Sequence, residues 1–261
     1  MALNNTTVPT YPDLAGKVAV VTGGSGGIGS ETCRHFAANR MRVVVNGRDK
    51  DAIDAVVADI VAHGGEAIGI AADCTEASEI AALVERTERE VGPVDVLAAF
   101  AGFDSGPAPV TEVTEQAWRS VLDGNLTATF LTVTAFLPGM IERRHGSIIT
   151  MSSASGRLPG WSSVAYAAAK AGILMLTRRL AMDVGRYDIR VNALAPSAIL
   201  TEKQARNIPI EVRNKVTEEQ FFLARWGTPA DCANAALFLA SDASSWITGQ
   251  TTDIAGGKIM M

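Results

Sequence analysis

The sequence has few of the side chains that bind metals or form disulfides. Its 261 residues include three cysteines and three histidines, and none of them stands at the short spacings of zinc ligands. Cys33, Cys74 and Cys232 are an odd and scattered set, which indicates reduced thiols rather than a disulfide framework. The sequence therefore predicts no metal site and a cytoplasmic location.

A basic surface and a membrane-spanning run are also missing. The net charge of −5 argues against a nucleic-acid partner. No uninterrupted apolar run approaches the ~20 residues that cross a bilayer, so we expect no membrane partner. Residues 1–13 have neither the basic start nor the apolar core of a secretory signal. We expect these residues to form a polar lead-in to one domain, 14–261.

What the sequence does contain is an alternation of short apolar runs with longer helical patterns. Such an alternation predicts an α/β protein whose parallel sheet is covered on both faces, a doubly wound Rossmann fold. A long helix is expected from Glu115 to Arg143 with a break near Gly124, and 197–222 is expected as a polar, irregular insertion. About seven strands are predicted, at 17–22, 42–46, 67–73, 95–102, 146–153, 189–196 and 251–257.

A glycine-rich segment, VVTGGSGGIGS, joins the first predicted strand to the first helix. Gly24, Gly26 and Gly29 fit one dinucleotide-binding register, and Gly23, Gly27 and Gly29 fit another. A plain structural turn is the alternative. Because glycines at this first crossover let the backbone approach a pyrophosphate at a helix N-terminus, we favour nucleotide binding.

The end of the second predicted strand bears on the choice of cofactor. An acidic residue there would hold the ribose hydroxyls of NAD, but the segment reads VVVNGRDK, with Gly47 in the acidic position and Arg48 after it. A guanidinium can bind a 2′-phosphate in a bidentate way. The alternative is a surface arginine at a helix start that Asp49 caps. We favour NADPH over NADH.

Tyr166 and Lys170 stand four residues apart in SSVAYAAAKAGILML, so they share one face of a helix. A nearby ammonium favours a phenolate, and we expect a buried lysine together with the positive nicotinamide of an oxidised cofactor to lower the pKa of the tyrosine. Such a phenol can exchange a proton with a carbonyl or alcohol oxygen. The alternative is an amphipathic helix with a surface lysine.

Together these motifs resemble those of the short-chain dehydrogenase/reductase family over nearly all of 13–258. TGGSGGIG is similar to its cofactor loop, which favours the register with Gly23, Gly27 and Gly29, and YAAAK is similar to its Y-x-x-x-K motif. MSSASG, DGNL, ADCT and WITGQTTDIAGG are similar to further family segments. The resemblance implies a single-domain Rossmann fold, an NAD(P)-dependent oxidoreductase and a homotetramer.

The resemblance also implies roles for individual residues. Ser153 would hold the substrate oxygen near Tyr166, and Lys170 would bind the nicotinamide ribose. Asn125 would hold a water that relays protons from Lys170. Ser152 is the rival of Ser153, but neighbours in a strand face opposite sides and the thirteen-residue spacing to Tyr166 favours Ser153. The implied cofactor contacts are Gly23, Ser25, Gly27, Ile28, Gly29, Arg48, Asp73, Ala101, Gly102, Tyr166, Lys170, Ile199 and Thr201.

Three positions depart from the family pattern. Ala99 and Phe100 replace two asparagines after the fourth strand, and we expect fewer hydrogen bonds there. Ser197 replaces a glycine after the sixth strand, where the backbone nears the nicotinamide. These departures put the fine geometry of cofactor binding in question.

The closest resemblance is to the 3-oxoacyl-carrier-protein reductase branch, so an NADPH-dependent reductase of 3-oxoacyl thioesters or related ketones is expected. Arg143 and Arg144 would contact an acyl carrier protein, or would merely favour a helix C-terminus. Alternatives are an alcohol or sugar dehydrogenase working in the oxidative direction and a silent dinucleotide sensor. An enoyl reductase is disfavoured, because family members with that activity usually space tyrosine and lysine more widely. Residues 197–222 are expected to close over the substrate, with Phe103, Trp161 and Phe222 lining an aromatic pocket.

Overall fold

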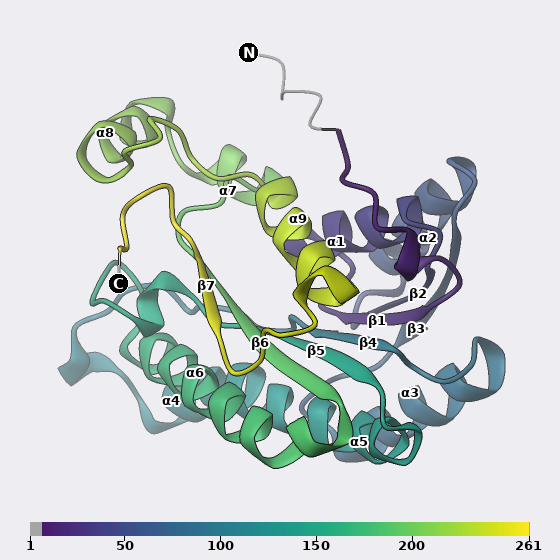
Figure 1. Cartoon of the computed structure of the whole chain (residues 1–261). Coiled ribbons are helices and arrows are strands. Elements are labelled where there is room, and N and C mark those ends of the chain that lie inside the picture. Colours follow the sequence, from purple (N-terminus) through teal and green to yellow (C-terminus); the bar gives the residue numbers. More distant parts are fainter. Residues whose placement is uncertain (1–6, 261) are drawn as a thin grey trace.

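One seven-stranded parallel sheet forms the centre of the molecule (Figure 1). The computed structural model describes residues 7–260, so residues 1–6 of the predicted lead-in lie outside the described part. The strand order is β3-β2-β1-β4-β5-β6-β7 with parallel pairing throughout, which confirms the predicted fold class. The strands are β1 (Val18–Thr22), β2 (Arg42–Gly47), β3 (Glu66–Ala71), β4 (Val96–Ala99), β5 (Gly146–Met151), β6 (Ile189–Pro196) and β7 (Thr251–Ile254).

Helices cover both faces of this sheet (Figure 1). The side chains of α1, α2 and α9 pack on one face, and those of α3, α5 and α6 pack on the other. Every residue of β1, β4 and β5 is buried, as expected for strands covered on both sides. The helices are α1 (Gly27–Ala38), α2 (Lys50–Ala62), α3 (Ala77–Glu90), α4 (Glu115–Leu122), α5 (Ala128–Arg143), α6 (Val164–Val184), α7 (Glu202–Asn207), α8 (Ile210–Gln220) and α9 (Pro229–Ala240).

The predicted break in the long fourth helix is present. A π-helical turn at Asp123–Thr127 separates α4 from α5. The ring of Phe103 lies so close to Gly124 that a Cβ atom there would approach its Cε1 to 2.4 Å. The turn brings Asn125 into the protein interior, fully buried, and π turns of this kind are frequent at functional sites.

The stretch Glu115–Arg143 is long and apolar enough to cross a membrane by length and composition alone, with a mean hydropathy of 1.2. This qualifies the expectation that no such run exists. In the folded chain 39% of the most apolar window is buried, and Val133, Phe136 and Met140 pack in the core against the sheet. Core helices meet the same criterion, so the stretch is weak evidence for a membrane span.

The expectation of an irregular segment at 197–222 is wrong, because most of it is helical. Thr201 caps α7 through a reciprocal pair of contacts with Gln204, and Pro209 precedes the first residue of α8. Trp226 Nε1 donates to the carbonyl of Arg213 at 3.1 Å, which ties α8 to the chain that follows it. Figure 1 shows both helices beyond the carboxyl ends of β6 and β7.

Candidate active site

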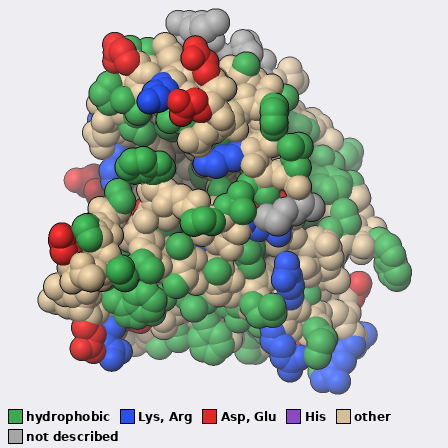
Figure 2. Space-filling view, turned by 90° about the vertical axis from the view of Figure 1, so that its left-hand side faces the viewer, with side chains coloured by type: hydrophobic (Ala, Val, Ile, Leu, Met, Phe, Trp, Pro, Cys, Tyr) green, Lys and Arg blue, Asp and Glu red, His purple; other side chains and the backbone are tan. Residues whose placement is uncertain are grey.

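The predicted site residues lie where the parallel strands end. β1 pairs with β2 on one side and β4 on the other, so successive crossovers leave β1 in opposite directions and open a crevice at the carboxyl ends. Ligands of open α/β sheets bind at such a switch point. The space-filling view from this side shows a hollow with hydrophobic side chains around it (Figure 2).

The glycine loop leaves β1 and starts α1, and it has no room for a side chain at Gly24 or Gly29. A Cβ atom on Gly29 would stand 2.1 Å from the carbonyl oxygen of Gly23, and Gly23 itself has a φ of +65°. Gly26 and Gly27 are exposed at the start of α1, where unpaired amides and the helix dipole favour an anion. A Cβ atom on Gly27 would contact Thr201 Cγ2 at 3.4 Å, so Thr201 lies directly across the loop. This cradle fits a dinucleotide pyrophosphate.

Ser25 packs against the end of β2. A Cβ atom on Gly47 would approach Ser25 Oγ to 2.6 Å, so a carboxylate side chain at position 47 meets a steric obstacle there. The next residue, Arg48, is 73% exposed, and its Nη1 lies 3.7 Å from Asp73 Oδ2. The Thr75 amide, the Thr75 hydroxyl and Arg48 lower the pKa of Asp73, so this carboxylate is charged at neutral pH.

Lys170 lies buried beside Tyr166 on α6, which excludes the surface-lysine alternative. Its side chain is 2% exposed, and its Nζ lies 5.3 Å from the Tyr166 ring centroid. The Nζ also donates to the carbonyl of Met151 at 2.8 Å, at the end of β5. Burial lowers the pKa of Lys170 to about 7, so the amine is able to gain or lose a proton near neutral pH.

Among the chain's own groups, Lys170 does not lower the pKa of Tyr166 as expected; the effect of an oxidised nicotinamide stays a prediction. Burial raises the pKa of Tyr166, a hydrogen bond with Ser153 lowers it, and the charge of Asp104 raises it. Desolvation dominates because a phenolate loses its hydration in this half-buried position. The lysine is itself desolvated and its Nζ faces Met151, so the residues present hold Tyr166 as a neutral phenol, the form that donates a proton.

The two neighbouring serines have separate partners. Ser152 Oγ donates to the carbonyl of Lys170 at 2.7 Å, in the buried interface of β5 with α6. Ser153 is half-buried, and its hydroxyl lies close enough to the Tyr166 phenol to lower the pKa of that phenol. Its Oγ accepts from the amide of Ser155 at 3.1 Å and donates to the carbonyl of Pro196 at 3.5 Å. Of the two hydroxyls, the structure therefore brings that of Ser153 to the tyrosine.

Asn125 faces Lys170 across Gly102. Its Nδ2 donates to the carbonyls of Phe103 at 2.7 Å and Val121 at 2.8 Å, while its buried Oδ1 has no partner among residues 7–260. A Cβ atom on Gly102 would stand 2.4 Å from that Oδ1 and 3.2 Å from Lys170 Nζ. A buried carbonyl oxygen without a donor is costly, and this one is suited to accept from a water beside the lysine.

Comparisons with known proteins identify the family of this chain. A family model described as enoyl-(acyl carrier protein) reductase matches residues 23–258. The chain belongs to the short-chain dehydrogenase/reductase family. A 3-oxoacyl-[acyl-carrier-protein] reductase of Synechocystis sp. is 38% identical over 95% of this chain and 98% of that protein. Glucose 1-dehydrogenase 2 of Bacillus subtilis is 35% identical over 96% and 97%.

Solved structures of other short-chain dehydrogenases/reductases have the same fold. A 3-oxoacyl-[acyl-carrier protein] reductase from Brucella melitensis superposes with a TM-score of 0.92 at 32% identity, covering 100% of this chain and 99% of that one. A reductase of the same name and organism with bound NAD gives 0.89 at 33%, covering 100% and 99%. A protein from Beutenbergia cavernae, described as a putative NAD(P)-dependent gluconate 5-dehydrogenase with NADP bound at low occupancy, gives 0.88 at 35%, covering 94% and 98%. The chain is accordingly an NAD(P)-dependent oxidoreductase acting on CH–OH or C=O groups.

In this short-chain dehydrogenase/reductase the backbone after β4 is hydrogen-bonded although Ala99 and Phe100 replace the two asparagines of the family pattern. The Thr22 hydroxyl accepts from the amides of Phe100 at 3.1 Å and Ala101 at 3.2 Å. Phe100 is buried in the core beside α1, so an apolar contact occupies the place of an amide side chain. Ser197 donates its amide to the carbonyl of Ile254 at 3.0 Å, which holds the backbone to the end of β7.

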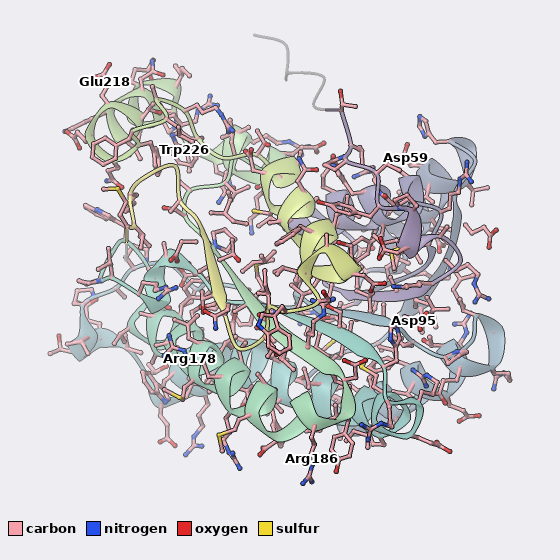
Figure 3. The ribbon with its side chains drawn as sticks, in the orientation of Figure 1. Asp59, Asp95, Arg178, Arg186, Glu218 and Trp226 are labelled. Carbon is pink, nitrogen blue, oxygen red and sulfur yellow. The ribbon has the colours of Figure 1, made fainter. Side chains whose placement is uncertain are left out.

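Some predicted residues lie away from the catalytic cluster. Arg143 donates to the carbonyl of Val94 at 2.6 Å, and Arg144 lies 5.9 Å from the ring of Tyr187. This group is at the far end of α6 from Tyr166, about 30 Å along the helix axis; Figure 3 labels Arg186 there.

The expected aromatic side chains are open to solvent: Phe103 is 40% exposed, Phe222 79% and Trp161 90%.

Two site residues were missed from the sequence. Ser163 caps α6, with its Oγ accepting from the amide of Tyr166 at 3.1 Å, and a serine three residues before the tyrosine was a readable capping signal. Asp104 accepts from the amide of Ser163 at 3.2 Å. Nothing in its sequence context marks Asp104, because the contact joins segments 59 residues apart.

Proposed function

We propose that this protein is an NADPH-dependent carbonyl reductase, with Tyr166 as the proton donor and a 3-oxoacyl thioester or related ketone as substrate. The observation that carries the proposal is the cluster of Tyr166, Ser153, Lys170 and Asn125 beside the glycine loop. A protein that only binds a dinucleotide has no use for such a proton path, so the silent sensor is disfavoured.

In this mechanism the protein orients the substrate and supplies a proton. Bound NADPH would supply the hydride. The Ser153 hydroxyl and the Tyr166 phenol hold the carbonyl oxygen, and the phenol donates its proton as negative charge develops there. Lys170, with a pKa of about 7, then returns a proton to the tyrosine. The unpaired Asn125 Oδ1 holds the water that connects Lys170 to solvent.

The cofactor would lie across the glycine loop. Its pyrophosphate would meet the start of α1 near Gly27, with Ile28 and Thr201 alongside, and Asp73 would meet the adenine. The exposed guanidinium of Arg48 supports a 2′-phosphate there. Remaining contacts are assigned to Gly23, Ser25, Gly29, Ala101, Gly102 and Ile199.

A dehydrogenase acting in the oxidative direction is the second candidate, because glucose 1-dehydrogenase 2 is nearly as similar as the reductase. The deciding experiment follows reduced-cofactor absorbance with a panel of ketones, 3-oxoacyl thioesters, polyols and sugars, using each of the two cofactors. Reduction of ketones with NADPH at a kcat/KM at least tenfold above that with NADH supports the proposal. Turnover confined to polyol or sugar oxidation with NAD contradicts it.

Docking of an acyl carrier protein is a separate part of the proposal. Arg143 and Arg144 would be the contacts, yet within one chain they lie at the opposite end of α6 from Tyr166 and have partners of their own. Ketones that are not attached to a carrier protein are therefore proposed as substrates on the same footing as carrier-bound 3-oxoacyl groups. The kcat/KM for a carrier-bound 3-oxoacyl group, compared with the matching free thioester, decides between the two.

The lid and the assembly are also proposed. Residues 197–222, containing α7 and α8, would close over the substrate from their anchored base at Trp226. We propose a cytoplasmic homotetramer with α4, α5, α6 and β7 at its interfaces. Exposed apolar side chains on these elements and nearby support this assembly: Phe130, Met175, Met182 and Trp246. Light scattering coupled to gel filtration measures the mass directly.

A further inference from the structure

Consecutive residues of the loop after β4 lie beside different parts of the catalytic cluster. Gly102 lies between Asn125 Oδ1 and Lys170 Nζ, and the next residue, Phe103, covers the π-helical turn at Gly124. Asp104 follows, and the loop there reaches the N-terminus of α6. This path brings a carboxylate to the opening of the site, two residues beyond the backbone assigned to the cofactor.

One carboxylate oxygen of Asp104 holds the side chain in place. Its Oδ1 accepts from the amides of Gly106 at 3.1 Å and Ser163 at 3.2 Å. Ser163 in turn caps α6 through the amide of Tyr166. The carboxylate is thereby fixed within one helical turn of Tyr166. The residue is exposed, and no hydrogen bond to its Oδ2 is found in the described part of the chain.

The other charged groups around Tyr166 do not neutralise the negative charge of Asp104, because each is buried or paired elsewhere. Lys170 is buried on the inner side and bonded to Met151. Arg157, on the turn after Ser153, forms a two-pronged ion pair with Asp253 of β7, at 3.0 Å for each contact. On α7 the exposed Glu202 and Arg206 pair with each other. Asp104 is the carboxylate whose charge reaches the phenol, where it opposes ionisation.

We propose that Asp104 is a specificity-determining residue, whose carboxylate at the opening of the site selects neutral carbonyl substrates over substrates with an anionic group next to the carbonyl. The inference rests on the proposed carbonyl reductase function and specifies its substrate class. A carboxylate or phosphate close to the reacting carbonyl would meet the like charge of Asp104, whereas an ester or thioester would not. The effect is electrostatic, so it weakens as salt is added.

A pair of ketones that differ in charge tests the proposal: acetoacetate and ethyl acetoacetate. Asp104→Asn keeps the accepting oxygen that anchors Gly106 and Ser163 and removes the charge. The ratio of kcat/KM for acetoacetate to that for ethyl acetoacetate is expected to rise about two- to fivefold, the size for unit charges ~8 Å apart at a partly hydrated surface. Glu112→Gln, in the same loop, is the matched control and leaves the ratio unchanged.

Two results overturn the proposal. One is a ratio in Asp104→Asn that equals the wild-type ratio at low salt. The other is a rise that persists unchanged at 1 M salt, which indicates a steric cause. Failure of the wild type to reduce either ketone counts instead against the proposed function.

A second measurement reads the charge without substrate or cofactor. The chain has three tyrosines, so the tyrosinate absorbance of Tyr166 is obtained as the difference between each protein and its Tyr166→Phe counterpart during rapid pH jumps. Asp104→Asn is expected to lower the pKa of Tyr166, and Glu112→Gln to leave it unchanged. An unaltered pKa in Asp104→Asn shows that the charge does not reach the site and refutes the inference, whatever the enzyme reduces.

Discussion

The side-chain nitrogen of Lys170 lies 5.3 Å from the centroid of the Tyr166 ring, inside the protein and bonded to the end of β5. Burial has opposite consequences for the two groups: it raises the pKa of the phenol and lowers that of the amine. Both effects favour neutral forms. The pair therefore starts as a phenol with a proton to donate and an amine that exchanges protons near pH 7.

The buried amine makes stability depend on pH. Lys170 has a pKa of about 7 in the folded chain, against roughly 10.4 for an unfolded lysine. Between these values the unfolded chain binds more protons, so this residue's contribution to the unfolding free energy rises with pH and is lost as pH falls towards 7. In urea titrations, the wild type minus Lys170→Met difference should rise by up to about 1.4 kcal/mol per pH unit in this window. A flat difference contradicts the burial argument, and Lys215→Met, at an exposed side chain, is the control.

The two serines after β5 should separate chemistry from stability. Ser153→Ala is expected to lower kcat about 100-fold or more while hardly changing the unfolding free energy, because its hydroxyl serves the substrate oxygen. Ser152→Ala is expected to cost about 1–2 kcal/mol of stability, since the buried hydrogen bond from the Ser152 hydroxyl to the Lys170 carbonyl is lost, with kcat within about threefold. Steady-state kinetics and urea unfolding on both variants check this, and an exchange of the two outcomes would contradict the assignment.

Asn125→Ala should affect both properties. Removing Nδ2 leaves the carbonyls of Phe103 and Val121 without a donor, at a cost of about 1–3 kcal/mol of stability. Removing Oδ1 deprives the proposed proton-relay water of its acceptor, so kcat falls while KM changes little. A kcat equal to that of the wild type in a folded variant would exclude the relay.

Arg48→Ala tests the cofactor assignment. Without the guanidinium, the affinity for NADPH is expected to fall about 10- to 100-fold, the loss of a charge-assisted bidentate contact, and NADH binding should stay within about threefold. Thermal shift and cofactor fluorescence measure both affinities without turnover. An equal loss of affinity for NADPH and NADH would contradict a contact between Arg48 and the 2′-phosphate, which only NADPH carries.

Much of the fold was predictable from periodicity and glycine placement. The seven apolar runs became seven strands, and the break near Gly124 became a π-helical turn. The two helices within 197–222 were missed, although Thr201 followed by Gln204 three positions later is a capping signal. The polar composition of the segment concealed it, because helices packed on one side at a surface carry few apolar residues.

The sequence allowed the residues of the site to be predicted, but not the directions of their pKa shifts. Tyr166 and Lys170 share a helix face by spacing alone, but the direction of each pKa depends on burial by segments far away in sequence. Asp104 acts through an amide 59 residues further along. The Thr22 hydroxyl accepts from the amides of Phe100 and Ala101, beside the position where fewer hydrogen bonds were expected. Such long-range pairs have no local signature.

The central claim is that the Tyr166 phenol donates the proton to the substrate oxygen. Tyr166→Phe keeps the ring and deletes this donor. Ketone reduction should fall at least about 100-fold, as for loss of a general acid, while the thermal shift with NADPH stays that of the wild type. Reduction by a folded, cofactor-binding Tyr166→Phe at the wild-type rate would contradict the account.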